Sequence, residues 1–254
     1  MRSMKKQAAY FIFLLRGLVG AASALAGPSL FALDAATAWK SAVAMNAAAK
    51  TLYPGAVSFE TIEYGKKDEI IAREEMSSRV VYGADGETTN EIVRAVKDGK
   101  DVTAERKAEF GKKGKPKKNG GAQQSGGFSL PEPFNPPAGA KSVIGVAARA
   151  SQDGFEYWEF PFEYSLKGSM PWAGTIRLDL ATGRPVSMSY AFKNPPLGIK
   201  YAHFLVAFAP FGDSAFIAER MDIDFDAQIL LIHKKMDMRI AMSDYQERGR
   251  VYGD

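Results

Sequence analysis

The 254-residue chain contains no cysteine and only two histidines. Without cysteine there is no disulfide, no thiol nucleophile and no thiolate ligand for a metal, so stability must come from buried surface. His203 and His233 do not form a zinc-type pair, and no nucleophile or orienting partner can be named for either. The sequence also lacks a Gly-x-Ser-x-Gly elbow and a phosphate-binding glycine loop. We therefore expect a protein that is not an enzyme, with no catalytic residues, no metal site and no cofactor.

The N-terminus has the features of an export signal. Arg2, Lys5 and Lys6 precede an apolar stretch, and Ala24-Leu25-Ala26 fits a small-x-small cleavage site. An uncleaved membrane anchor is the alternative, but Arg16 leaves no apolar run of the ~20 residues that a spanning helix needs. The sequence predicts a signal peptide over residues 1–26 and a mature protein in the periplasm or another extracytoplasmic space.

Removing this leader changes the meaning of the charge. The chain has 33 basic and 29 acidic residues, and the leader holds four basic residues and no acid, so the mature chain has 29 of each. The basic sequence pI therefore comes from the leader and does not indicate a nucleic-acid partner.

Residues 155–245 alternate between apolar and polar side chains. Met236, Met238, Ile240 and Met242 fall on one face of an extended chain, with polar or small residues between them. Similar alternation predicts strands near residues 155–164, 175–180, 186–192, 199–208, 216–225 and 229–245. Earlier in the chain, strands are predicted from residue 57, at 70–72, at 79–82 and at 91–97. This pattern predicts antiparallel sheet with one apolar face.

Two regions break the strand pattern. Asp34 caps a predicted helix that runs to about Lys50 and carries an apolar stripe. Residues 99–142 form a charged, flexible insertion, with a short helix predicted from Thr103 to Phe110 and a Pro-rich return near residues 130–137.

A run of lysines inside the insertion is a candidate contact for an anionic membrane surface. The alternative is a solubilising loop. No aromatic residues stand beside the run for base stacking, which argues against nucleic acid. The lysines are Lys112, Lys113, Lys115, Lys117 and Lys118.

Three alternating aspartates, Asp222, Asp224 and Asp226, would share one strand face. Oxygen ligands suit a hard cation, but the glycine and closing glutamate of an EF-hand loop are absent. We favour cross-strand ion pairing, with Asp237 and Arg239 as neighbours.

The apolar face is the main candidate for ligand binding. Methionine is flexible and polarisable, so it adapts to irregular ligands such as acyl chains. The alternative is an ordinary core covered by the helix at residues 34–50. The residues predicted to line the face are Trp158, Phe160, Phe162, Met188, Tyr190, Met236, Met238 and Met242.

The order of these elements resembles the periplasmic lipoprotein-carrier superfamily (LolA/LolB-like). Leu178-Asp179-Leu180-Ala181-Thr182-Gly183-Arg184-Pro185-Val186 looks like its strand–turn–strand with a Gly-x-Pro turn, and Met238-Arg239-Ile240-Ala241-Met242-Ser243-Asp244-Tyr245 looks like its late strand. The resemblance implies a β-dominated α+β domain over residues 27–254: a curved antiparallel sheet, or open half-barrel, with the N-terminal helix packed on its concave face. The insertion at 99–142 departs from the family.

The resemblance also implies a function. We expect an extracytoplasmic carrier or binding protein for lipid or lipidated protein, acting in outer-membrane lipoprotein sorting or envelope maintenance. Its partners would be lipid or an acylated protein, with a possible envelope protein and transient membrane contact. The alternative is a non-enzymatic protein-interaction or envelope-assembly module with a closed core.

Overall fold

The computed structural model describes residues 32–82, 88–113, 131–229 and 232–247. The predicted leader at residues 1–26 lies outside them. Two helices are described, α1 (Ala35–Ala49) and α2 (Thr103–Lys113). The strands are β1 (Leu52–Tyr53), β2 (Ala56–Tyr64), β3 (Ile70–Tyr82), β4 (Thr88–Lys97), β5 (Lys100–Asp101), β6 (Ala140–Ile144), β7 (Ala148–Gln152), β8 (Phe155–Leu166), β9 (Trp172–Asp179), β10 (Pro185–Phe192), β11 (Ile199–Phe211), β12 (Ala215–Ile229), β13 (Ile232–Ser243) and β14 (Gln246–Glu247).

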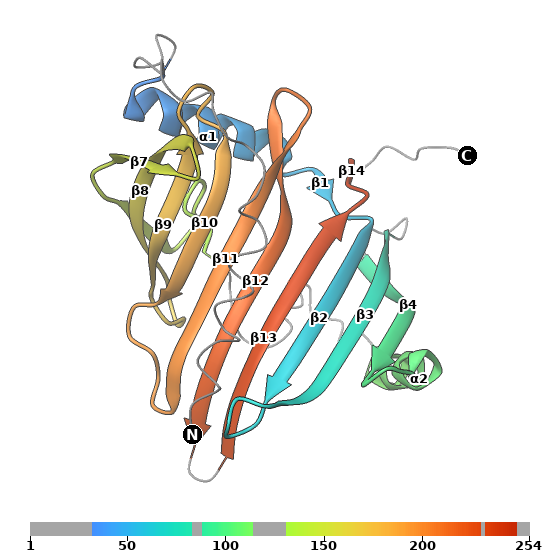
Figure 1. Ribbon diagram of the computed structural model, residues 1–254. Helices are drawn as coiled ribbons and strands as arrows, with labels where there is room; N and C mark the ends of the chain where they lie inside the picture. Colours follow the sequence, from blue (N-terminus) through green and yellow to red (C-terminus); the bar gives the residue numbers. More distant parts are fainter. Residues whose placement is uncertain (1–31, 83–87, 114–130, 230–231, 248–254) are drawn as a thin grey trace, which may run out of the picture. The chain divides into compact units, whose positions relative to one another are not determined.

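Twelve of these strands form one antiparallel sheet (Figure 1). Their order is β5-β4-β3-β2-β13-β12-β11-β10-β9-β8-β6, and β7 also pairs with β8. The two ends of this order do not pair with each other in the described part of the chain, so the sheet does not close into a barrel. The predicted β-dominated α+β class, with an antiparallel sheet and an N-terminal helix, is confirmed.

The strand register shows how apolar and charged side chains are distributed between the two faces of the sheet. Met238 lies opposite Ile223 on β12 and Thr61 on β2, whereas Arg239 lies opposite Asp222 and Glu60. Successive residues of a strand point to opposite sides. One face of β12 and β13 is therefore largely apolar, and the other carries most of the charges.

Strand β3 corrects one prediction. The sequence predicted two short strands, at 70–72 and 79–82, because the charged residues between them broke the apolar pattern. The structure has one strand of 13 residues. Arg73 pairs with Glu60 on β2 at 2.6 Å, and Glu74 pairs with Arg106 on α2 at 2.7 Å. These charges have partners on both faces, so they do not interrupt the strand.

Helix α1 begins at the predicted cap. The Asp34 carboxylate accepts hydrogen bonds from the Thr37 backbone N–H at 2.9 Å and from its hydroxyl at 2.8 Å. These bonds stabilise the charged form and lower the pKa of Asp34. Ala38 and Ala42 are fully buried, and the helix contacts β9 and β12. Small side chains on the buried stripe let the helix backbone lie close to the sheet.

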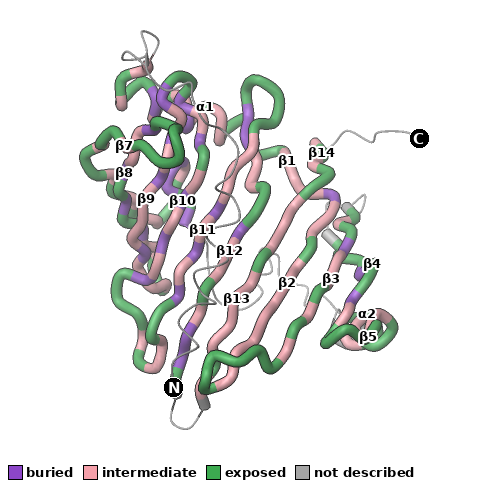
Figure 2. The backbone as a smooth tube through the Cα atoms, viewed as in Figure 1, coloured by how far each residue is buried: buried purple, intermediate pink, exposed green. Residues whose placement is uncertain are grey.

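The core lies beneath α1, on one face of β8 to β12. Figure 2 shows buried residues concentrated in these elements, while β13 and β2 are mostly intermediate and β3 alternates between intermediate and exposed residues. Aromatic contacts dominate: the Tyr190 and Phe204 rings stack with centroids 5.0 Å apart, and Trp172 stacks on Phe192 at 4.2 Å. Gly174 is needed in this core, because a Cβ there would lie 2.7 Å from the Tyr190 Cβ.

The insertion returns to the core after its undescribed residues. Helix α2, predicted to end at Phe110, continues to Lys113 and contacts β4. After residues 114–130, the Pro-rich segment brings Phe134 into the core, where it is 7% exposed. Its ring lies 5.2 Å from Trp39 on α1 and 5.7 Å from Phe216 on β12. Phe134 therefore closes the space between α1 and β12.

The turn between β9 and β10 fixes the position of α1, and this gives a stability prediction. Gly183 has φ +69°, and a Cβ there would lie 2.7 Å from the Ala38 carbonyl oxygen. Gly183→Ala should therefore lose roughly 3 kcal/mol of unfolding free energy in urea denaturation, from left-handed strain of about 1–2 kcal/mol plus displacement of the helix.

Gly212→Ala is the matched control. Gly212 has φ +59° with open space around its Cβ position, so only the strain of about 1–2 kcal/mol applies. Equal losses from the two variants would contradict the close helix contact.

Candidate functional site

The eight predicted lining residues share one face of the sheet, but they separate into two groups. Phe160, Phe162, Met188 and Tyr190 are 1–6% exposed in the core beneath α1. Trp158 is half-buried at the edge of that core, and its indole N–H donates to the Leu33 carbonyl at 2.9 Å. This group packs against the protein's own side chains and forms a closed core.

The other group is half-buried and lies between the two helices. Met236, Met238 and Met242 on β13 are joined by Phe59 on β2 and Met76 on β3. We call these five residues the methionine strip. The sequence predictions included its three β13 methionines but missed Phe59 and Met76, although the start of alternation at Val57 and Phe59 was visible.

The neighbours of the methionine strip define its borders. On one side, Ile223 and Phe225 of β12 pack at the margin of the buried core. On the other side, Arg106 of α2 forms a two-pronged ion pair with Glu74, with both N–O distances at 2.7 Å. Glu74 and Met76 share a strand face, so α2 lies over the same face as the methionine strip. The strip is thus an apolar surface with a helix on either side.

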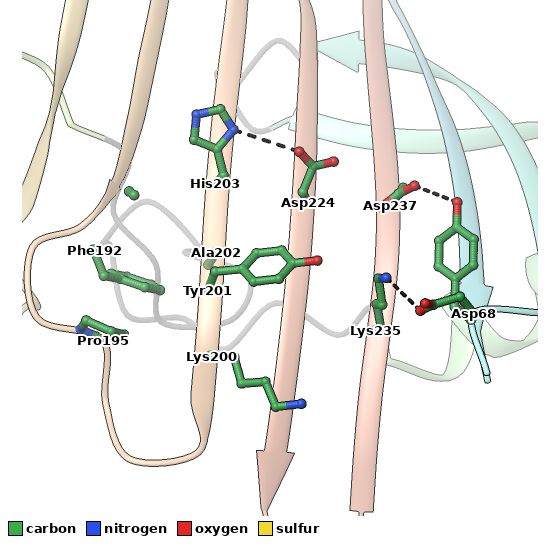
Figure 3. A pocket seen from close by; sticks show the side chains of 12 residues that line it. Asp68, Phe192, Pro195, Lys200, Tyr201, Ala202, His203, Asp224, Lys235 and Asp237 are labelled. Carbon is green, nitrogen blue, oxygen red and sulfur yellow. Dashed lines mark hydrogen bonds and ion pairs between the residues drawn. The ribbon is translucent and has the colours of Figure 1, made fainter. Parts of the chain in front are cut away.

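The opposite face carries a polar cleft of about 730 Å³ (Figure 3). It lies on the far side of the sheet from the core because Tyr201 and His203 alternate with the buried Ala202 and Phe204. Figure 3 shows the Tyr201 ring extending from β11 toward β12. The lining residues are Tyr64, Asp68, Ala191, Phe192, Pro195, Lys200, Tyr201, Ala202, His203, Asp224, Lys235 and Asp237.

Two of the three alternating aspartates form the expected ion pairs on this face. Asp222 pairs with Arg220 at 2.9 Å and with Arg239 at 2.7 Å. Asp226 pairs with Lys200 at 3.7 Å and is also hydrogen-bonded to the His233 ring at 3.0 Å. Asp224 instead lies directly opposite Asp237. Within the described ranges, no group of three or more acidic or histidine side chains is placed to hold a metal ion.

His203 has neighbours that the sequence could not identify. Its Nε2 is hydrogen-bonded to the Ser189 Oγ at 2.8 Å, and its Nδ1 lies 3.8 Å from an Asp224 carboxylate oxygen. The order of these groups matches a Ser-His-Asp triad. Ser189, however, sits within the β9-β10-β11 ladder, opposite Thr175 and Leu205. Its neighbouring backbone N–H groups belong to that ladder, so they are not arranged to stabilise an oxyanion. The arrangement supports binding by hydrogen bonds and charge rather than acyl transfer.

The β2 side of the cleft is also held by hydrogen bonds. The Tyr64 hydroxyl donates to the Asp237 carboxylate at 2.6 Å, which raises the pKa of Tyr64 to about 12. Lys235 donates to Asp68 at 2.7 Å and lies 5.5 Å from the centre of the Tyr64 ring. This contact lowers the pKa of Asp68 and raises that of Lys235. The Asp68 carboxylate and the Lys235 ammonium therefore stabilise each other in their charged forms.

The predicted membrane-contact lysines fall at the edge of the described structure. Lys112 and Lys113 belong to the last turn of α2, and their side chains are not described. Lys115, Lys117 and Lys118 lie outside the described residues. Among the residues that the structure describes, no helix is long and apolar enough to span a membrane.

Comparisons with known proteins found structural likeness only. No protein-family model and no curated protein sequence matches the chain. An outer membrane lipoprotein-sorting protein domain from Vibrio parahaemolyticus aligns with 78% of this chain and 87% of its own, at 10% identity and a TM-score of 0.33. Two structures of MucB in complex with MucA, one of them described as from Pseudomonas aeruginosa, align with 86% and 84% of this chain and 100% of theirs, at 9% and 8% identity and a TM-score of 0.19.

The resemblance to the lipoprotein-sorting fold is thus confirmed and is weak. A likeness at this level carries no argument about function, which rests on the residues themselves.

The Tyr64–Asp237 contact gives a pH prediction. Replacing Asp237 with asparagine should lower the pKa of Tyr64 from about 12 toward the usual tyrosine value of 10.0, because the raised pKa depends first on this hydrogen bond. Since the folded-state pKa is raised, the stability from this contact is present below pH ~10 and is lost as the pH rises toward 12. Tyrosine-selective NMR titration of wild type and variant would measure both values. An unchanged Tyr64 pKa in Asp237→Asn would contradict the assignment, and Asp213→Asn is the control.

Proposed function

We propose that the protein is an extracytoplasmic carrier that binds the acyl chains of lipid or of a lipidated protein on the methionine strip. The observation that carries this proposal is a group of large apolar side chains on one sheet face, Met236, Met238, Met242, Phe59 and Met76, all left half-buried between two helices. A stable core would be expected to bury such residues. An apolar strip that is left partly accessible and bordered by charged groups is typical of a surface that meets an apolar partner.

The chemistry of the strip suits an acyl chain. Methionine side chains are unbranched and polarisable, so they can adjust to a flexible hydrocarbon. Each CH₂ group removed from water contributes about 0.8 kcal/mol, so eight buried groups would supply roughly 6 kcal/mol before the cost of ordering the chain. The Arg106–Glu74 pair at the edge of the strip would leave a charged border at one side of the bound chain.

Because the core beneath α1 is closed, this proposal includes only part of the ligand-binding face predicted from the sequence. Phe160, Phe162, Met188 and Tyr190 already fill their space, so the acyl chain would contact β12, β13, β2 and β3 only. The same closed core supports the second candidate function, an envelope-assembly module. In that case the methionine strip would be covered by a protein partner instead of lipid.

A fluorescent fatty-acid probe tests the carrier proposal. The double variant Met236→Gln/Met238→Gln keeps side-chain length but adds amide groups to the strip. Loss of roughly 2 kcal/mol of apolar contact should weaken binding about 30-fold, measured by fluorescence titration. Val143→Gln is the control, because Val143 is 49% exposed on β6 and lies opposite Glu163, on the other face.

Circular dichroism and thermal melting would verify that the variants fold. Undiminished probe binding by the double variant, or the absence of lipid in native mass spectra of protein purified from its own host, would argue against lipid carriage. A stable protein partner that is lost in the same double variant would favour the assembly module.

A further inference from the structure

The polar cleft has a feature that the acyl-binding proposal does not use. Asp224 on β12 and Asp237 on β13 are direct partners in the antiparallel register. Their side chains lie on the same face, opposite to the methionine strip. Two like charges placed directly across a sheet destabilise it. Something other than fold stability must account for this pairing.

Other carboxylates on this part of the face have cationic partners. Asp222 has two arginines, and Asp68 has Lys235. Asp226 has the Lys200 ammonium at 3.7 Å, in addition to a hydrogen bond with the His233 ring. The two lysines that line the cleft, Lys200 and Lys235, are therefore already paired with carboxylates.

The opposed carboxylates are not matched in this way. Among the described residues, no lysine or arginine pairs with Asp224 or Asp237. Asp237 accepts one hydrogen bond from the Tyr64 hydroxyl, and Asp224 has only the His203 ring, at 3.8 Å. The floor of the cleft thus holds two negative charges that lack a full positive partner.

The rest of the cleft suits an organic cation. The Tyr201 side chain lines it, and aromatic rings attract cations to their faces. Pro195 and Ala191 also line the cleft and can contact a hydrocarbon segment. A volume of about 730 Å³ falls within the range of small-molecule sites. A bare metal ion fits less well, because hard cations need six or more oxygen ligands at close range.

We propose that the polar cleft binds a small organic cation with a primary ammonium group, held between the Asp224 and Asp237 carboxylates and against the Tyr201 ring. The ammonium donates hydrogen bonds to both carboxylates and removes their mutual repulsion. The apolar part of the ligand extends toward Pro195. This inference goes beyond acyl binding and does not depend on it, since the two sites occupy opposite faces.

Isothermal titration calorimetry with spermidine at low salt tests the proposal. We expect saturable binding by the wild type that weakens as salt is added, because salt screens partly exposed charges. Asp224→Asn should weaken binding about tenfold or more, since it removes one charge-assisted hydrogen bond. Asp213→Asn, an exposed acid-to-amide change in the β11–β12 turn, should leave the affinity unchanged. The neutral analogue 1,8-octanediol should not bind.

A parallel titration with phosphoethanolamine distinguishes the source of the ammonium group. Tighter binding of spermidine assigns the site to free amines, whereas tighter binding of phosphoethanolamine assigns it to an aminolipid headgroup. Either result supports an ammonium site. Absence of saturable binding for both compounds, or equal affinity in wild type and Asp224→Asn, would overturn the proposal.

Thermal melting without ligand provides a second measurement. Asp224→Asn should raise the melting temperature by a few degrees, because it relieves the opposed charges, and spermidine should stabilise the wild type but not this variant. If Asp224→Asn melts at a lower temperature and spermidine does not stabilise the wild type, the carboxylates are structural and the proposal is wrong.

Discussion

The structure depends on how much of one sheet face two short helices can cover. The eleven strands along the main order, spaced about 4.8 Å apart, span roughly 48 Å. Helix α1, with 15 residues, is about 22 Å long, and α2, with 11, is about 16 Å long. Even laid directly across the strands, they would leave a width of about two strands uncovered. The half-buried methionine strip on β13 and its neighbours lies between the regions that the helices contact.

The way α1 docks decides which part of the face is closed. Ala38 and Ala42 bring the helix backbone down to the sheet, and Gly183 allows it to touch the β9–β10 turn. The Ser41 hydroxyl donates to the Thr182 carbonyl at 3.0 Å, which fixes this contact. The side chains beneath the helix, such as Phe160 and Tyr190, are packed against it and buried. The same close packing that stabilises the domain therefore confines any apolar ligand to the methionine strip.

Much of the fold could be predicted from the sequence, but the candidate sites could not. Alternation identified the strands from β8 to β13 and put all eight predicted lining residues on one face, because side-chain direction has a fixed period of two. It divided β3 into two strands and gave no prediction for β6 and β7. It could not show that Phe160 and Tyr190 lie under a helix while Met238 does not. Which strands a helix covers depends on tertiary packing, and the alternation of side chains carries no information about that. The contacts of His203 with Ser189 and of Asp224 with Asp237 depend on register across β10 to β13. Turn lengths and bulges set that register, and they could not be predicted from the one sequence.

Both candidate sites lie where a rule of stable folding is broken, which is where function is expected in a natural protein. Large apolar side chains stay half-exposed on one face, and two carboxylates oppose each other on the other. The same strands supply both features: Asp224 and Asp237 alternate with Ile223, Phe225, Met236 and Met238. Because successive residues of a strand share one backbone, neither site can be shifted in register without turning its side chains to the wrong face. The register of β12 on β13 is therefore under a double constraint, which favours a single fixed pairing despite the repulsion that it contains.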